Sequence, residues 1–314
     1  MEEKLELFTK GCLGGCWDGK YHYLEPWAGC GHDCPYCYAR LRGPVTQKLA
    51  ELGASFARPH PLYPEAQLLE KISETANSGE IVTLKLCRYT DIFSPEFVNG
   101  GLALKVLERL GNSKVKRIII TTKGLPDKKI IKLLAAAPDK FSYNAAARPL
   151  SEVVFEKELA PLAKRLSAAA EISRSGVRTT VHLDPFVAGF DDEDRALSKF
   201  LGDLKELGLN RVMFSYLLLS REMLSGLAGA LKPELLEAIT ALYDMEADKQ
   251  YLPGREEASY WSLKPEVKRA SVEKTALLLE EMGFEFVLCS LKNTPGLDIS
   301  KFKKTILCDG KFYA

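Results

Sequence analysis

The stretch "GLALKVLERLGNSKVKRIIITTKG", residues 101–124, joins a helical pattern to a strand pattern. Apolar residues recur every three to four positions over 101–111, which is typical of an amphipathic helix packed on a core. Gly111 follows the last apolar position, as expected at the C-terminus of a helix. The β-branched run at 115–123 then predicts a buried strand. A helix followed directly by a strand of this kind indicates an α/β fold.

The same alternation recurs along most of the chain and predicts a parallel sheet. Helices are predicted at 64–79, 101–111, 127–137, 155–176, 192–208 and 265–283, and strands at 80–87, 115–123, 140–147, 177–186, 210–219 and 284–290. We expect a partial (β/α)6-type parallel barrel with N- and C-terminal extensions, in which ligands bind at the carboxyl ends of the strands. The polar residues expected there are Cys87, Arg88, Thr90, Asp91, Thr121, Thr122, Lys123, Asn144, His182 and Asp184.

Composition narrows the class of protein. The 314 residues suit a single α/β barrel, and 43 basic against 42 acidic residues give a net charge of +1. That balance argues against a protein that binds nucleic acid through its overall positive charge, but it does not exclude a local basic groove. The charged N-terminus lacks the apolar core of a signal peptide, and no run approaches the ~18 apolar residues of a membrane span. We expect a cytoplasmic protein with no membrane contact, whose clustered cysteines bind metal or act in catalysis.

The segment "AGCGHDCPYCYAR", residues 28–40, holds Cys30, Cys34 and Cys37 at a C-x3-C-x2-C spacing. Thiolates suit zinc, copper(I) and iron–sulfur centres. Structural zinc sites use four ligands, commonly as two cysteine pairs, so a zinc-stabilised binding module would need the Cys12/Cys16 pair or a histidine to complete the site. A cubane [4Fe–4S] cluster held by three cysteines instead leaves one iron open to a non-protein ligand, which explains the missing fourth thiol.

This motif and the aromatic residue after it resemble the signature of the radical S-adenosylmethionine (SAM) superfamily. Four segments resemble its spore photoproduct lyase and DNA photolyase-like branch, namely "EPWAGCGHDCPYCYARL" (25–41), "LCRYTDIFSPE" (86–96), "IIITTKG" (118–124) and residues 148–194. The resemblance implies a radical SAM core at 24–220, preceded by an N-terminal extension at 1–23. A C-terminal region at 221–314 would complete the barrel and contribute to an auxiliary cluster.

The resemblance implies that Cys30, Cys34 and Cys37 hold a [4Fe–4S] cluster that binds SAM. Reductive cleavage of SAM, with electrons from a reductant such as flavodoxin or ferredoxin, would yield a 5′-deoxyadenosyl radical that abstracts hydrogen from an organic substrate. The branch points to DNA lesion repair by a lyase, with Arg40, Arg42 and Lys48 as candidate backbone contacts. The alternative substrate is a peptide or small molecule, modified with the help of an auxiliary iron–sulfur cluster.

Several residues take cofactor roles by the same resemblance. Lys123 stands where the family places a lysine that meets the carboxylate of SAM, a pairing that suits a cation; a solvated strand-end lysine is the alternative. Asn144 and Thr122 would bind polar groups of the cofactor, although Asn144 also fits a turn. Tyr36 and Tyr38 resemble the tyrosine pair near the radical path, and Tyr38 also fits packing near adenine.

The remaining cysteines raise two further hypotheses. Cys87 resembles the cysteine that donates a hydrogen atom to the substrate radical, but two residues separate it from the Thr90-Asp91 pair where the family has one. A buried thiol acting as a small hydrophobic group is the alternative. Cys12, Cys16, Cys308 and Cys289 would hold the auxiliary cluster and link the two ends of the chain; otherwise they are scattered thiols, with Cys289 in a core strand.

Overall fold

The computed structural model describes residues 4–13, 15–149, 159–246, 250–251, 259–290 and 306–312. Its main sheet has eight strands in the order β1-β2-β5-β6-β7-β8-β9-β12. These strands are β1 (Phe8–Lys10), β2 (His22–Leu24), β5 (Thr83–Leu86), β6 (Arg117–Thr122), β7 (Phe141–Ala146), β8 (Arg178–Phe186), β9 (Arg211–Tyr216) and β12 (Glu285–Leu288). Only the β1–β2 pair is antiparallel among these neighbours. The mainly parallel α/β fold predicted from the sequence is confirmed.

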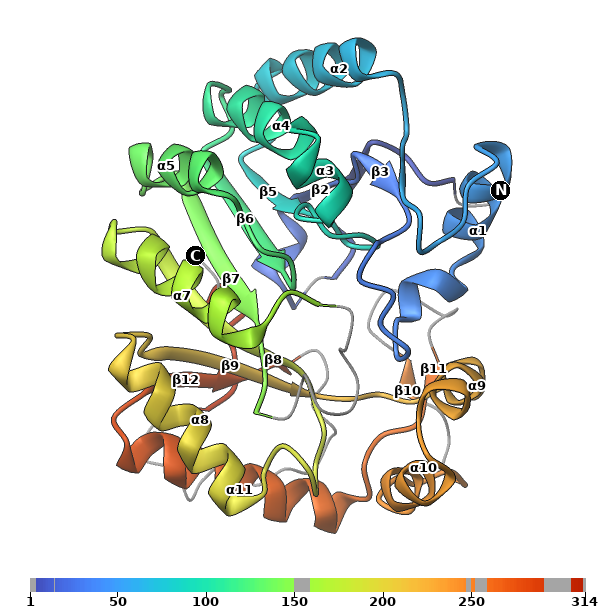
Figure 1. The fold of residues 1–314 in the computed structure, drawn as a ribbon, viewed down its shortest axis with the longest axis vertical. Helices are drawn as coiled ribbons and strands as arrows, with labels where there is room; N and C mark the ends of the chain where they lie inside the picture. Colours follow the sequence, from blue (N-terminus) through green and yellow to red (C-terminus); the bar gives the residue numbers. More distant parts are fainter. Residues whose placement is uncertain are drawn as a thin grey trace.

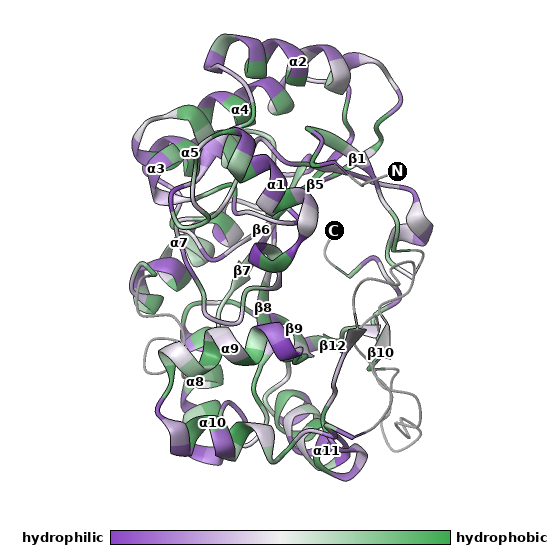
Figure 2. Ribbon diagram, turned by 90° about the vertical axis from the view of Figure 1, so that its right-hand side faces the viewer, coloured by the Kyte–Doolittle hydropathy of each residue, from purple (hydrophilic) through white to green (hydrophobic). Residues whose placement is uncertain are grey.

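A row of helices covers the outer face of the curved sheet (Figure 1). In chain order they are α2 (Glu65–Asn77), α4 (Leu102–Gly111), α5 (Lys128–Ala136), α7 (Leu162–Arg174), α8 (Asp194–Glu206) and α11 (Pro265–Glu281). Figure 2 shows hydrophobic and hydrophilic residues along these helices, and in α4, α5 and α8 all the buried residues are apolar. In α4 the buried stripe is Ala103, Val106, Leu107 and Leu110, the spacing that identified this helix in the sequence.

The predicted helix at 155–176 is shorter in the structure. Its first residues, 155–158, lie outside the described residues, and α7 begins at Leu162 behind Pro161. Proline fixes the first turn of a helix but cannot donate from within it, so Pro161 marks the natural start. No helix in the described ranges combines the length and apolar character needed to cross a membrane.

Shorter elements surround the open side of the sheet. They are η1 (Trp17–Gly19), β3 (Trp27–Ala28), η2 (Tyr38–Leu41), α1 (Gly43–Glu51), β4 (His60–Pro61), α3 (Pro95–Asn99), α9 (Arg221–Ala230), α10 (Pro233–Thr240), β10 (Gln250–Tyr251) and β11 (Ser259–Tyr260). The sequence analysis did not predict them. Most have five residues or fewer, which is too short for a periodic pattern, but α1 and α9 are as long as the predicted α5 and were missed.

The N-terminal residues belong to the main sheet. β2 pairs with β5 in parallel, with Leu24 opposite Leu86, and β1 adds to its other edge. The boundary that we placed between residues 23 and 24 therefore falls inside β2. Residues 22 and 23, the last of the extension expected at 1–23, thus form part of the first parallel strand.

Two segments near the ends of the chain meet at the edges of the sheet. Residues 306–312 run beside β12, where the amide of Cys308 donates to the carbonyl of Leu288 at 2.9 Å. On the other side, the amide of Trp17 donates to the carbonyl of Gly310 at 3.1 Å. Gly310 has φ +88°, and a Cβ there would collide with the backbone of Gly15, so this approach requires glycine. The C-terminal segment thus bridges β12 and the N-terminal loop.

Candidate active site

A cavity of about 390 Å³ opens at the carboxyl ends of the parallel strands. The polar residues predicted at these strand ends line it, with the exception of Asn144. Aromatic and apolar side chains from later elements complete its wall, including Leu217, Met223 and Tyr260. The cavity therefore lies where a parallel α/β fold places its ligands.

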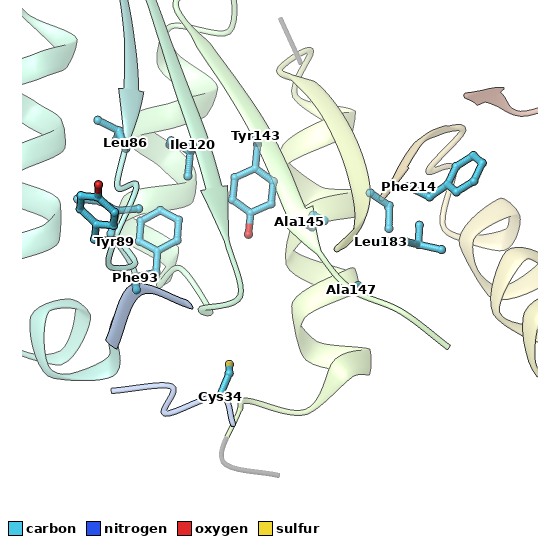
Figure 3. Close-up of a cluster of buried hydrophobic side chains, with 14 of the residues drawn as sticks. Cys34, Leu86, Tyr89, Phe93, Ile120, Tyr143, Ala145, Ala147, Leu183 and Phe214 are labelled. Atoms are coloured by element: carbon cyan, nitrogen blue, oxygen red, sulfur yellow. The ribbon is translucent and has the colours of Figure 1, made fainter. Parts of the chain in front are cut away.

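The three cysteines of the C-x3-C-x2-C motif line this same cavity. Their loop turns at Gly29, which has φ +85° and lies so close to Phe56 that a Cβ would sit 2.6 Å from its carbonyl oxygen. The amide of Cys30 donates to that carbonyl at 2.7 Å. Figure 3 shows Cys34 on this loop, beneath the strand ends that carry Ile120 and Tyr143.

A buried carboxylate ties the cysteine loop to the sheet. Asp91 Oδ2 lies 3.1 Å from His32 Nε2 and accepts the amide of Lys123 at 2.7 Å, while Oδ1 accepts the hydroxyl of Thr122 at 2.6 Å. Burial raises the pKa of Asp91, but His32 and these hydrogen bonds outweigh it and hold the pKa below its usual range. The carboxylate is thus charged at neutral pH and fixes His32, inside the cysteine motif, against the end of β6.

Thr122 and Lys123 differ in how they meet the cavity. The Thr122 hydroxyl donates to Asp91 and accepts the amide of Gly124 at 2.8 Å, so it serves the loop as well as lining the cavity. Lys123 Nζ donates to the carbonyl of Asp184 at 2.8 Å and lies 5.4 Å from the ring centroid of Tyr36. An ammonium in this position can bind a carboxylate that enters the cavity.

Asn144 lies within the strand layer. Its side chain is fully buried, and Nδ2 donates to the carbonyl of Ile120 at 3.0 Å. Its Oδ1 has no hydrogen-bond partner among the described residues. The amide was expected at the cofactor's polar edge; the structure places it on β7 outside the residues that line the cavity.

Cys87 and Tyr38 both line the cavity, and Arg88 links them. Cys87 follows β5 with φ +64°, a conformation that costs energy for a residue with a side chain. The Tyr38 hydroxyl donates to the carbonyl of the next residue, Arg88, at 2.7 Å. Burial, followed by the nearby charges of Glu25 and Asp91, raises the pKa of Cys87 well above its usual value. The thiol therefore keeps its proton at neutral pH.

Tyr36 is more deeply placed than Tyr38. Its ring is buried and lies 5.9 Å from the guanidinium of Arg148, which pairs at 2.9 Å with the fully buried carboxylate of Asp191. This ion pair holds Arg148 under the cysteine loop. Tyr38, in contrast, is 38% exposed and reaches the mouth of the cavity.

Glu25 is a site residue that the sequence reasoning missed. It follows β2 and is 2% exposed, and its Oε1 accepts the amides of Arg88 and, at 3.1 Å, Tyr89. Its Oε2 has no hydrogen-bond partner in the described part of the chain. Burial raises the pKa of Glu25 to about 8. Glu25 thus holds the turn that carries Cys87. The one feature of the sequence that could have indicated this role is a carboxylate placed between an apolar strand and Trp27.

Glu25→Gln should remove a pH dependence of stability. The pKa of Glu25 is about 8 in the folded state, against an ordinary 4.5, so folding favours the protonated carboxyl. The protonated Glu25 therefore adds to the free energy of unfolding in full below pH 4.5, and this contribution is lost as the pH rises towards 8. Glutamine does not titrate, so between pH 5 and 8 the variant should gain on the order of 2–4 kcal/mol relative to the wild type. Urea unfolding at both pH values measures this, with the exposed Glu51→Gln as the control. Parallel pH curves for wild type and Glu25→Gln would show that Glu25 ionises normally.

Four other cysteines lie near the contact between the N-terminal loop and residues 306–312. Cys16, Cys289 and Cys308 are buried and Cys12 is half-buried. The amide of Gly310 donates to Cys308 Sγ at 3.2 Å, and Cys16 Sγ lies 3.7 Å from the carbonyl oxygen of Gly310. Across the described ranges, no three His, Cys, Asp or Glu side chains meet closely enough to hold a single metal ion.

The basic residues expected to contact a nucleic-acid backbone have partners within the protein. Arg40 pairs with Asp33, and Lys48 lies 3.1 Å from Glu51. Arg42 is buried and donates to the hydroxyl of Tyr260 at 2.9 Å, at the cavity wall. Of the three, Arg42 is placed to meet a ligand in the cavity.

Comparison with known proteins identifies the fold. No family model matches the chain, and no curated protein matches it. Among solved structures, a Cys-to-Ala variant of spore photoproduct lyase with dinucleoside spore photoproduct gives a TM-score of 0.58 at 16% identity, covering 83% of this chain and 73% of the other. The chain has the fold of spore photoproduct lyase.

Two further spore photoproduct lyase structures agree. Another structure of a Cys-to-Ala variant has a TM-score of 0.60 at 15% identity, and a Tyr-to-Phe variant has a TM-score of 0.60 at 14% identity. Both cover 83% of this chain and 74% of the other. The resemblance to spore photoproduct lyase that the sequence predicted is confirmed for the fold.

Proposed function

We propose that this protein is a radical SAM enzyme that abstracts hydrogen from an organic substrate. The observation that carries the proposal is the C-x3-C-x2-C loop, whose three thiols line a cavity at the carboxyl ends of the parallel strands of a spore photoproduct lyase fold. Three thiolates suit a [4Fe–4S] cluster with one iron left for SAM. When bound and reduced, cluster and SAM together supply a 5′-deoxyadenosyl radical.

The chain's own residues fit the binding of this pair. Asp91 fixes His32 within the cysteine motif, which orients the loop as outer partners of metal ligands do. Lys123 offers an ammonium to the carboxylate of SAM, and the buried Tyr36 ring lies beside it. The guanidinium of Arg148 lies over the ring of Tyr36 and helps to hold it in place.

Cys87 and Tyr38 would move a hydrogen atom. The protonated Cys87 thiol gives its hydrogen to a carbon radical of the substrate, so that an S–H bond breaks, a C–H bond forms and a thiyl radical remains. The Tyr38 O–H, which donates to the carbonyl of Arg88, would then restore the thiol by giving up its own hydrogen. An electron and a proton from a reductant such as flavodoxin or ferredoxin then reset the tyrosine.

A DNA lesion is the first candidate substrate, because the matched lyase has been captured with a dinucleoside spore photoproduct. Arg42, Tyr38 and Tyr89 give the cavity the planar groups on which a base can stack. A peptide or small molecule is the second candidate. The neutral net charge and the four additional buried or half-buried cysteines favour it.

The test is anaerobic reconstitution with iron and sulfide, followed by reduction in the presence of SAM. We expect a brown protein that releases 5′-deoxyadenosine and methionine, whereas a protein that takes up zinc and leaves SAM intact would refute the proposal. Adding dinucleoside spore photoproduct then separates the substrate classes. Repair to thymidine supports the DNA candidate, and SAM cleavage without repair supports the second.

A further inference from the structure

Three buried cysteines from opposite ends of the chain meet where the C-terminal segment bridges the sheet. Cys16 lies in the N-terminal loop, Cys289 directly after β12, and Cys308 in the terminal segment. Cys16 and Cys308 flank Gly310, at 3.7 Å from its carbonyl oxygen and 3.2 Å from its amide nitrogen. Cys289 and Cys308 belong to one buried cluster. The fold thus gathers thiols that are nearly 300 residues apart in sequence.

Two buried ammonium groups lie against these cysteines. Lys85, 9% exposed, has its Nζ 2.6 Å from Cys16 Sγ and 4.3 Å from the ring centroid of Tyr21. Lys268, 3% exposed, has Cys289 as an electrostatic partner. A negative charge beside a buried cation stabilises it. Thiolates that ligate a metal centre would place such a charge next to both ammonium groups.

This group borders the candidate active site. Lys85 and Cys289 line the same cavity as Cys30, Cys34 and Cys37. Cys12 lies in the same loop as Cys16, and both cysteines lie near Tyr21, whose hydroxyl accepts the amide of Leu13 at 3.3 Å. The loop therefore brings a fourth thiol to the group.

We propose that Cys12, Cys16, Cys289 and Cys308 hold an auxiliary iron–sulfur cluster with Lys85 and Lys268 as its counter-charges. A cluster suits this set better than one ion, because its ligands are spread around several metal atoms while the thiols here do not converge on a single point. Four thiolates leave no open iron, so the cluster passes electrons between an external reductant and the cavity. It is a cofactor in addition to the one in the proposed function.

Iron and sulfide counts on the reconstituted full-length chain test this proposal. The Cys30→Ala/Cys34→Ala/Cys37→Ala variant should keep about four irons per chain, where the wild type holds about eight. The Cys16→Ala/Cys308→Ala variant should lose about four. A triple variant that binds no iron, or that binds zinc without sulfide, overturns the proposal.

Two controls keep the test decisive. Cys87→Ala removes a thiol from the same cavity and should keep the full iron count. If the Cys16→Ala/Cys308→Ala variant fails to fold by circular dichroism, the triple variant decides alone, because its auxiliary cysteines are intact. Lys85→Met is made in the background of the triple variant, where only the auxiliary cluster remains. It should keep the iron and make the reduction potential of that cluster more negative, because a nearby cation is lost. An unchanged potential would remove Lys85 from the site.

The outcome is independent of the proposed function. Wild-type protein that cleaves SAM while the triple variant is free of iron supports the radical enzyme and refutes the auxiliary cluster. Iron that persists in the triple variant, with no SAM cleavage by the wild type, supports the auxiliary cluster and refutes the radical enzyme.

Discussion

Cys34→Ala is expected to abolish the formation of 5′-deoxyadenosine from SAM. Cys34 is 8% exposed and lies at the centre of the cysteine loop, where its carbonyl accepts the amide of Cys37 at 3.0 Å. Removing its thiol leaves two protein ligands for a cluster that needs three to keep its geometry and its open iron. Chromatography of the reaction under reducing conditions measures the loss, and iron analysis should show the loss of the iron that this loop holds.

Asp91→Asn provides a graded comparison. Asparagine keeps an oxygen for the Thr122 hydroxyl but loses the charge that faces His32, so the loop should form with weaker support. Changes to such outer partners typically cost 10–100-fold in metal affinity or activity. SAM cleavage that survives in Cys34→Ala would show that this loop does not hold the reacting cofactor, whatever Asp91→Asn does.

The elements that local pattern could predict are those that pack on the core by themselves. β6 could be predicted as a strand because the β-branched residues Ile118, Ile119 and Ile120 come shortly after a helix that ends at Gly111. β2 has only three residues, and its pairing with β5 defines it as a strand. A strand that depends on a partner about sixty residues away leaves no periodic signal in its own sequence.

The residues of the candidate site also divide into those that a local pattern predicts and those that it does not. Polar residues at strand ends could be predicted, because parallel strands end at one edge of a sheet. The role of Glu25 could not, because its partners are the backbone amides of Arg88 and Tyr89, which carry no mark in the sequence. Lys85 lies within "TLKL", a strand that is buried at all four positions, and its Nζ lies 2.6 Å from Cys16 Sγ, a contact that no local pattern indicates.

Cys87→Ala should separate the start of the reaction from its end. The variant keeps Cys30, Cys34, Cys37 and Lys123, so it should still bind the cofactor and form 5′-deoxyadenosine at a rate within a few-fold of the wild type. Its substrate radical finds no S–H bond in reach, because alanine replaces the one thiol held on the turn that Glu25 secures. The expected result is loss of the correctly quenched product and the appearance of side products.

Cys87→Ser is the matched control, because its hydroxyl preserves size and polarity while its O–H bond is too strong to give hydrogen to a carbon radical. Both variants should therefore fail alike, which a role in packing alone does not predict. In deuterated buffer the wild type should place solvent deuterium in the product through the exchangeable thiol of Cys87, and both variants should lose that label. Clean product with full deuterium content from Cys87→Ala would assign the hydrogen donor to another group, and Tyr38, one hydrogen bond from Arg88, would be the next to replace.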